Sequence, residues 1–269
     1  MPFADLPGAR VYYETAGSGH PVVFMHGSCL DSRMWDWQVD RVSQSYTVVR
    51  FDFRGHGRSG APDAGYSRPC LVEELRGLLD HLGIYRPSLV GHSMGGNVAL
   101  EYATTYPDKV TTLTLVDSGL EGYGVRPESF QRKFEERRRM IAKEGVTDRF
   151  VRAVLGSRLY AGVRRQPEVK TLVEDMLRRW SGLDWLEERD RGREQQHLVK
   201  QVGVPTLALV GEEDQARFHD IADLFTREIR VVRKELIPEA GHMAPMENPE
   251  AFNDILVDFL GGAVGKALI

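Results

Sequence analysis

The chain has 269 residues, of which 42% are hydrophobic and 28% charged, and its formal net charge is −4. This length suits one large α/β domain or two small ones, and the composition is that of an ordinary globular protein. The charge gives no sign of a nucleic-acid partner or of binding to an acidic membrane. With two cysteines and no Cys–His spacing typical of zinc, the sequence predicts neither a disulfide framework nor a metal site, and it suits a reducing compartment.

Targeting and membrane segments are not predicted. The N-terminal residues show no basic region followed by an apolar stretch, so no secretory signal is expected. No segment approaches the run of about 18 apolar residues that a membrane span needs. These features predict a cytoplasmic protein that has no membrane partner.

The first part of the chain alternates short apolar runs with helical patterns. Strands are predicted at 10–15, 22–25, 47–51, 88–91 and 110–116. The run Val22-Val23-Phe24-Met25 is typical of a strand buried on both faces. A helix is predicted over 69–82, where leucines recur at helical spacing. Another helix begins just after Ser93 and is stopped by Pro107.

The pattern changes between about Leu120 and Gln201, where β-like runs disappear and charge rises. Several short amphipathic helices are predicted here, the clearest from the helical spacing of apolar residues between Val169 and Trp180. Alternation then resumes with strands at 206–210 and 231–237 and helices at 216–227 and 249–259. We therefore predict an α/β core formed by 1–119 and 202–269, with a mostly parallel sheet covered by helices, interrupted by a helical insertion at 120–201.

One motif stands at a predicted strand-to-helix turn: Gly91-His92-Ser93-Met94-Gly95, of the form G-x-S-x-G. So sharp a turn holds the serine in a strained backbone conformation and needs small residues at its flanks. The serine hydroxyl is then exposed beside a helix N-terminus, where free N–H groups favour developing negative charge. Ser93 is the predicted nucleophile.

Two further polar residues follow predicted strands, Asp214 and His242. Ligand sites of parallel sheets lie beyond the carboxyl ends of the strands, so Ser93, Asp214 and His242 should meet at one edge. A serine hydroxyl needs a neighbouring base, which histidine supplies, and a carboxylate fixes the histidine tautomer and stabilises the imidazolium. The pattern predicts a catalytic triad.

These features together closely resemble the α/β-hydrolase fold family over nearly the whole chain. The matching stretches are Phe24-Met25-His26-Gly27, Asp52-Phe53-Arg54-Gly55-His56-Gly57-Arg58-Ser59, Gly91-His92-Ser93-Met94-Gly95-Gly96, Gly211-Glu212-Glu213-Asp214 and Gly241-His242. The order serine, aspartate, histidine is also that of the family. The resemblance implies an eight-stranded sheet with one antiparallel strand near the N-terminus and a helical cap, at 120–201, inserted after the sixth strand.

The resemblance further implies a cofactor-independent serine hydrolase of small carboxyl esters or lactones. A serine at this position resembles the nucleophile of esterases, lactonases and carbon–carbon bond hydrolases. Haloalkane dehalogenases and epoxide hydrolases place Asp there, so the serine argues against both of these classes. The backbone N–H groups of Ser28 and Met94 are the expected oxyanion donors. A carbon–carbon bond hydrolase and a catalytically silent, hydrolase-like binding protein stay open as alternatives.

Several residues compete with these assignments. Glu212 and Glu213 stand beside Asp214, and Asp117 follows the sixth predicted strand, where some family members carry their acid. We favour Asp214 because it follows the seventh predicted strand, the commoner placement in the family.

The other candidates have structural interpretations. His26 and His56 lie in predicted turns and suit structural roles. His92, next to Ser93, could line the substrate pocket or pack in the core. The glycines between Gly55 and Gly60 fit G-x-G-x-x-G, but a loop and not a helix is predicted after them, which excludes a dinucleotide site there.

Overall fold

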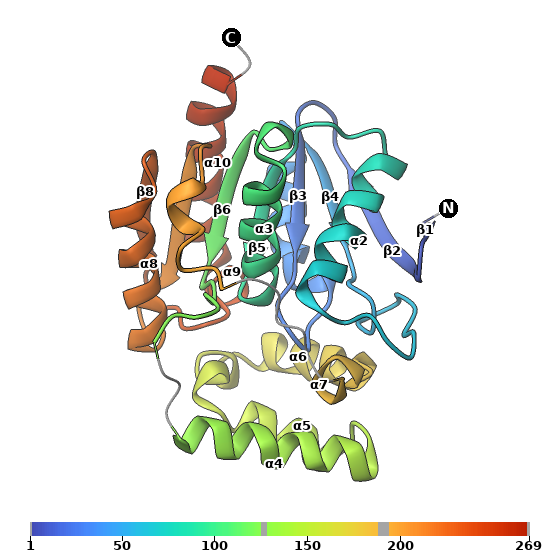
Figure 1. Ribbon diagram of the computed structural model, residues 1–269. Helices are drawn as coiled ribbons and strands as arrows, with labels where there is room; N and C mark the ends of the chain where they lie inside the picture. The colour runs from blue at the N-terminus through green and yellow to red at the C-terminus, as the bar shows by residue number, and fades with distance from the viewer. Residues whose placement is uncertain (1, 125–127, 188–193, 268–269) are drawn as a thin grey trace.

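The computed structural model describes residues 2–124, 128–187 and 194–267, and its centre is an eight-stranded sheet (Figure 1). The strands are β1 Phe3–Leu6, β2 Ala9–Ala16, β3 Pro21–Met25, β4 Thr47–Phe51, β5 Ser88–His92, β6 Thr112–Val116, β7 Thr206–Gly211 and β8 Val232–Ile237. Their order is β1-β2-β4-β3-β5-β6-β7-β8. Strand β2 pairs antiparallel with β1 and β4, and the other pairs are parallel. The predicted mostly parallel sheet is confirmed.

Both faces of the sheet are buried under helices. Alternate side chains of a strand point to opposite faces, so Val22 and Phe24 of β3 join one core cluster, whereas Val23 and Met25 join the other. The second cluster lies under helices that stand in front of the sheet in Figure 1. These are α2 Arg68–His81, α3 Met94–Thr105 and α8 Ala216–Glu228. The opposite face packs against α1 Asp36–Val42 and α10 Pro249–Ala267.

The element boundaries differ from the sequence prediction in a few places. Strand β1 was not predicted, because a four-residue edge strand with one buried side chain, Ala4, is too short to show a pattern. Strand β6 begins at Thr112, since the 3₁₀ turn Pro107–Lys109 precedes it. The last helix continues to Ala267, well past its predicted end.

Residues 128–186 form helices beyond the carboxyl ends of the parallel strands (Figure 1). They are α4 Glu128–Glu144, α5 Asp148–Leu155, α6 Pro167–Arg179 and α7 Leu183–Leu186. Helix α6 buries Val169, Val173 and Met176, the apolar stripe that the sequence predicts. Residues 125–127 and 188–193 of the predicted insertion lie outside the described residues.

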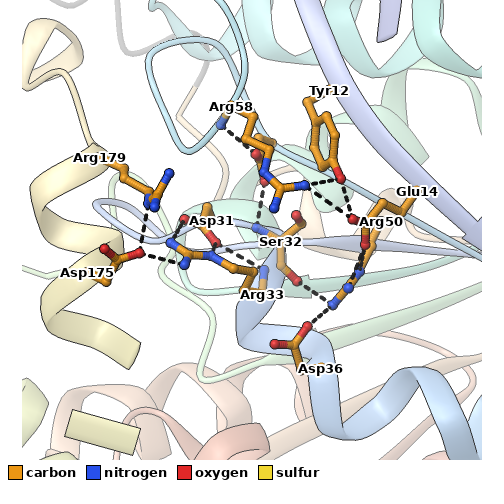
Figure 2. A network of polar contacts seen from close by, with 11 residues as sticks. Tyr12, Glu14, Asp31, Ser32, Arg33, Asp36, Arg50, Arg58, Asp175 and Arg179 are labelled. Carbon is orange, nitrogen blue, oxygen red and sulfur yellow. Dashed lines mark hydrogen bonds and ion pairs between the residues drawn. The ribbon is translucent and has the colours of Figure 1, made fainter. Parts of the chain in front are cut away.

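A polar network ties α6 to the loop after β3 (Figure 2). Asp31 accepts a hydrogen bond from the backbone N–H of Arg33 and pairs with its guanidinium at 2.6 Å. Arg33 also reaches Asp175 of α6 at 2.6 Å, and Asp175 pairs with Arg179 at 2.7 Å. The Asp31 side chain is 2% exposed, so the network is anchored in the core at one end and at the surface on the other. It fixes α6 next to the β3 loop.

None of the helices within 2–124, 128–187 and 194–267 combines the length and the apolar character needed to cross a bilayer.

Candidate active site

Ser93 occupies the turn between β5 and α3. Its backbone has φ 50° and ψ −105°, a conformation that non-glycine residues rarely adopt. The Ser93 N–H donates to the Val116 carbonyl of β6 at 2.9 Å, which holds the turn against the sheet. Strain of this kind costs about 1–3 kcal/mol and persists only where surrounding contacts enforce it. The predicted strand–turn–helix geometry is present.

Two glycines make this turn possible. A Cβ at Gly91 would collide with the Gly95 carbonyl oxygen, and a Cβ at Gly95 would collide with the carbonyl oxygen of Met25. The strand, the turn and the helix therefore approach each other more closely than any side chain would allow. This is the physical reason for glycine at both ends of the motif.

The structure brings Ser93, His242 and Asp214 into one hydrogen-bonded chain. His242 Nδ1 lies 2.7 Å from Asp214 Oδ2, and His242 Nε2 lies 3.2 Å from Ser93 Oγ. The side chains of His242 and Asp214 are 2% and 1% exposed. Because Nδ1 faces a carboxylate, it carries the proton and donates it to Asp214, which leaves Nε2 to accept from the Ser93 hydroxyl. Such a chain can deprotonate the serine when a substrate carbonyl is present.

His92 supports the His242 loop. Its Nε2 donates to the His242 carbonyl oxygen at 2.7 Å, so its Nδ1 carries no proton. Burial, reinforced by the nearby His242, lowers the pKa of His92 to about 3. His92 is therefore neutral near neutral pH and adds no charge beside His242. It packs against His242 with ring centroids 5.1 Å apart.

Glu247 is a supporting residue that sequence reasoning missed. Its carboxylate accepts hydrogen bonds from the backbone N–H groups of Gly241 at 2.5 Å and Met243 at 3.3 Å, on either side of His242. Burial raises the pKa of Glu247. Nothing in the sequence separates it from an ordinary surface glutamate before Asn248-Pro249, because only the fold turns its side chain back under the loop.

The backbone N–H groups of Ser28 and Met94 flank the serine. Met94 is the first residue of α3, where the N–H has no partner within the helix. Ser28 follows Gly27, where an added Cβ would lie 3.5 Å from Ser93 Cβ. Within the described part of the chain neither N–H donates a hydrogen bond. Both groups are thus available to an acceptor beside Ser93.

An aromatic cluster from the 128–186 helices contacts the same loop. Trp185 of α7 donates from Nε1 to Ser28 Oγ at 3.1 Å. Its ring packs against Trp180 at 4.9 Å and Phe134 at 4.8 Å between centroids. Because the Trp180 ring also faces His56, 6.2 Å away, the cluster joins this helical segment to the loops that follow β3 and β4.

The competing acidic residues lie in different surroundings. Glu212 and Glu213 are exposed, and Glu213 pairs with Arg165 at 2.6 Å. Asp117 is fully buried at the end of β6, and its Oδ1 accepts from the Gly211 N–H at 2.8 Å. It lies beside Asp214, but His242 donates to Asp214.

The remaining predicted features lie in the loops that follow β3 and β4. His26 bridges the Gly27 carbonyl and the Phe53 N–H, and His56 bridges the Arg54 carbonyl and the Cys29 N–H. These are the contacts of structural histidines, which link the β3 and β4 loops. The glycine-rich stretch 55–60 is a turn, and the next helix begins only at Arg68.

Comparison with known proteins decides the family. The sequence model of the alpha/beta hydrolase family matches residues 22–255. The chain belongs to this family. The match spans the sheet from β3, the serine turn, the helical insertion and the loop of His242, so the resemblance that the sequence suggested is confirmed.

Two relatives show how far the similarity in sequence extends. The chain is 37% identical over 119 residues to an uncharacterized protein of Mycobacterium tuberculosis, a match that covers 44% of this chain and 35% of that protein. It is 29% identical to a 2-hydroxy-6-oxononadienedioate/2-hydroxy-6-oxononatrienedioate hydrolase of Paraburkholderia phymatum, across 94% of this chain and 91% of the relative.

Two solved structures from the hydrolase family superpose along almost their full length. An enol-lactonase from Burkholderia xenovorans LB400 has a TM-score of 0.85 at 25% identity, covering 97% of this chain and 100% of that chain. A thermophilic esterase from Thermogutta terrifontis has a TM-score of 0.82 at 26% identity, with 97% of both chains covered. Family membership supports an enzyme that acts by hydrolysis.

Proposed function

We propose that the protein is a cofactor-independent serine hydrolase of small carboxyl esters or lactones. The observation that carries the proposal is the buried chain from Ser93 Oγ through His242 to Asp214, with contacts of 3.2 and 2.7 Å. These side chains come from three loops at one edge of the sheet. The strands and helices between the loops hold the three side chains in place. The lactonase and esterase similarities support the same reaction class.

In the proposed mechanism Ser93 Oγ attacks the substrate carbonyl carbon while its proton passes to His242 Nε2. Asp214 stabilises the resulting imidazolium, and the N–H groups of Met94 and Ser28 hold the tetrahedral oxyanion. His242 then gives the proton to the departing alkoxide oxygen, leaving an acyl group on Ser93. Water attacks this acyl group, and His242 takes the water proton and returns it to Ser93 Oγ.

A fluorophosphonate probe tests the nucleophile, since it reacts only with an activated serine. We expect covalent labelling of the wild type at Ser93 and no labelling of Ser93→Ala. The same pair of proteins is then assayed with nitrophenyl esters of increasing acyl length, with lactones and with a diketone. A catalytically silent protein would give no label and no difference between the two variants on any of these substrates.

Carbon–carbon bond hydrolysis is the second candidate, and the similarity to the Paraburkholderia phymatum dienedioate hydrolase favours it. The chemistry would use the same serine and histidine on a ketone carbonyl, with a carbanion and not an alkoxide as the leaving group. Wild-type turnover of the diketone well above that of every ester and lactone would decide for this alternative.

The oxyanion donors allow a backbone test. Ser28→Ala keeps the N–H and should change kcat little, whereas Ser28→Pro removes it and should lower kcat by about two orders of magnitude or more. Circular dichroism spectra and melting curves identify a proline variant that has not folded. Equal rates for the two folded variants would place the second oxyanion donor elsewhere.

We also propose that the helical segment within 120–201 is a cap that sets substrate preference. The Trp185 hydrogen bond to Ser28 supports this role, because it joins the segment to the loop beside Ser93. The ion pair between Arg33 and Asp175, drawn in Figure 2, joins α6 to the same loop. The two-cysteine content fits a cytoplasmic location, which we propose as well.

Trp185→Phe tests the cap, since it removes the indole donor and keeps most of the ring. We expect the ratio of kcat/KM between short and long acyl esters to change several-fold, with little change in Tm. Trp37→Phe, in α1 on a helix-covered face of the sheet, is the matched control and should leave that ratio unchanged. An unchanged ratio in Trp185→Phe would contradict a cap role for this residue.

A further inference from the structure

We propose that Asp117 is a positioning residue that holds a proton and donates it in a hydrogen bond to Asp214, so that one proton is shared behind His242. The proposal rests on the proposed function for its kinetic consequence, but the location of the proton itself can be tested without turnover.

Within the part of the chain that the structure describes, the surroundings of Asp117 leave one of its carboxylate oxygens without a hydrogen-bond partner. Oδ1 accepts from the Gly211 N–H at 2.8 Å, but Oδ2 is buried and has no hydrogen-bond partner among the described residues if both carboxyls are ionised. Asp117, Asp214 and His242 each place one polar atom within 4.8 Å of the other two. A buried carboxylate oxygen without a donor is unfavourable, because it has lost its contact with water and gained no hydrogen bond in return.

A proton on Oδ2 removes this cost, because an unsatisfied acceptor becomes a donor, and the neighbouring Asp214 carboxylate can accept from it. Two carboxylates that share a buried site cannot both ionise easily. Burial, the charge of Asp214 and the hydrogen bond between the two side chains raise the pKa of Asp117 well above its usual range. Asp214 keeps the negative charge because it accepts from His242 and from the Gln215 N–H.

The other ionisable groups around the pair do not supply the missing donor. Glu247 of α9, Ala244–Glu247, is acidic and accepts from backbone N–H groups. His92 at the end of β5 is neutral and donates to a carbonyl. Arg165 faces Glu247 from the cap and pairs with Glu213 at the surface. Among the described residues none of these groups donates to Asp117 Oδ2, so the proton between the two carboxyls is held by Asp117 itself.

This hydrogen bond has a kinetic consequence. It draws negative charge away from Asp214, so Asp214 stabilises the His242 imidazolium less and the base stays unprotonated to lower pH. Asparagine can reproduce the arrangement, since its amide oxygen accepts from Gly211 and its NH₂ group donates to Asp214. It also tolerates the Asp117 backbone, whose φ is 43°.

The first test compares pH–rate profiles of ester hydrolysis for the wild type, Asp117→Asn and Asp117→Gly, the last chosen because glycine also accepts a positive φ. The asparagine profile should superpose on that of the wild type, while Asp117→Gly should move the midpoint of the acid limb up by about half a pH unit or more and lower kcat. An asparagine profile shifted to lower pH by about one unit would mean that a charge was removed, and it would overturn the proposal. If the pH–rate profile of Asp117→Gly is identical to that of the wild type, Asp117 has only a structural role and the proposal is overturned.

The second test measures stability and needs no turnover. The pKa of Asp117 is raised in the folded state, so the folded chain keeps a proton that the unfolded chain releases once the pH exceeds the usual range of aspartate. The wild type should therefore lose stability relative to Asp117→Asn as the pH rises from about 5 to about 8. The urea concentration at the midpoint of unfolding should fall for the wild type relative to that of the variant over this range. Midpoints that stay parallel would place no proton on Asp117. Failure of Ser93 labelling would overturn the proposed function and leave this result standing.

Discussion

His242→Ala should lower kcat by about three to six orders of magnitude. In the proposed mechanism His242 Nε2, 3.2 Å from Ser93 Oγ, accepts the serine proton and later protonates the leaving group, so the variant loses both steps. In the wild type the rate should rise with pH through a single ionisation, as His242 loses its proton, and this dependence should be missing from the residual activity of the variant. Initial rates of ester hydrolysis across pH measure both effects.

A second histidine close to His242 provides the control. His92 packs against His242 and bonds its carbonyl, so His92→Ala removes a buried contact without removing the base. It should lower Tm and retain far more activity than His242→Ala. A His242→Ala protein that keeps more than a tenth of the wild-type rate would remove His242 from the mechanism.

Asp214→Asn should lower kcat by about four orders of magnitude, as an equivalent change does in a serine protease triad. Asparagine keeps the shape of the side chain, but its NH₂ group can donate to His242 Nδ1. The histidine then carries its proton on Nε2, where it can no longer accept from Ser93. The same change at Asp117 should cost less than about tenfold, because the hydrogen bond of His242 goes to Asp214 at 2.7 Å.

Parallel assays of the two asparagine variants test this assignment under one set of conditions. Both substitutions are isosteric and both side chains are buried, so we expect the two variants to have similar stability. Melting curves check this expectation. If Asp117→Asn is the inactive variant and Asp214→Asn the active one, Asp117 is the acid and our choice is wrong.

Local patterns in the sequence predict most of the fold. Apolar runs such as Val22–Met25 predict buried strands because a parallel sheet covered on both faces needs apolar side chains on both. The stripe from Val169 predicts α6 because helical spacing gathers these residues on one face. Strand β1 escapes prediction, since four residues at a sheet edge are specified by hydrogen bonds to β2 and not by a pattern of their own.

The sequence by itself determined the serine turn, because the glycines that permit it are its neighbours in the chain. It also indicated His242 and Asp214, since both follow strands whose carboxyl ends share one edge. Only the tertiary structure showed which of Asp214 and Asp117 the His242 ring contacts: both follow buried strands, and the orientation of the ring depends on contacts between loops far apart in sequence. Glu247 and Trp185 became visible for the same reason, because their partners are set by the folding of loops and helices onto one another.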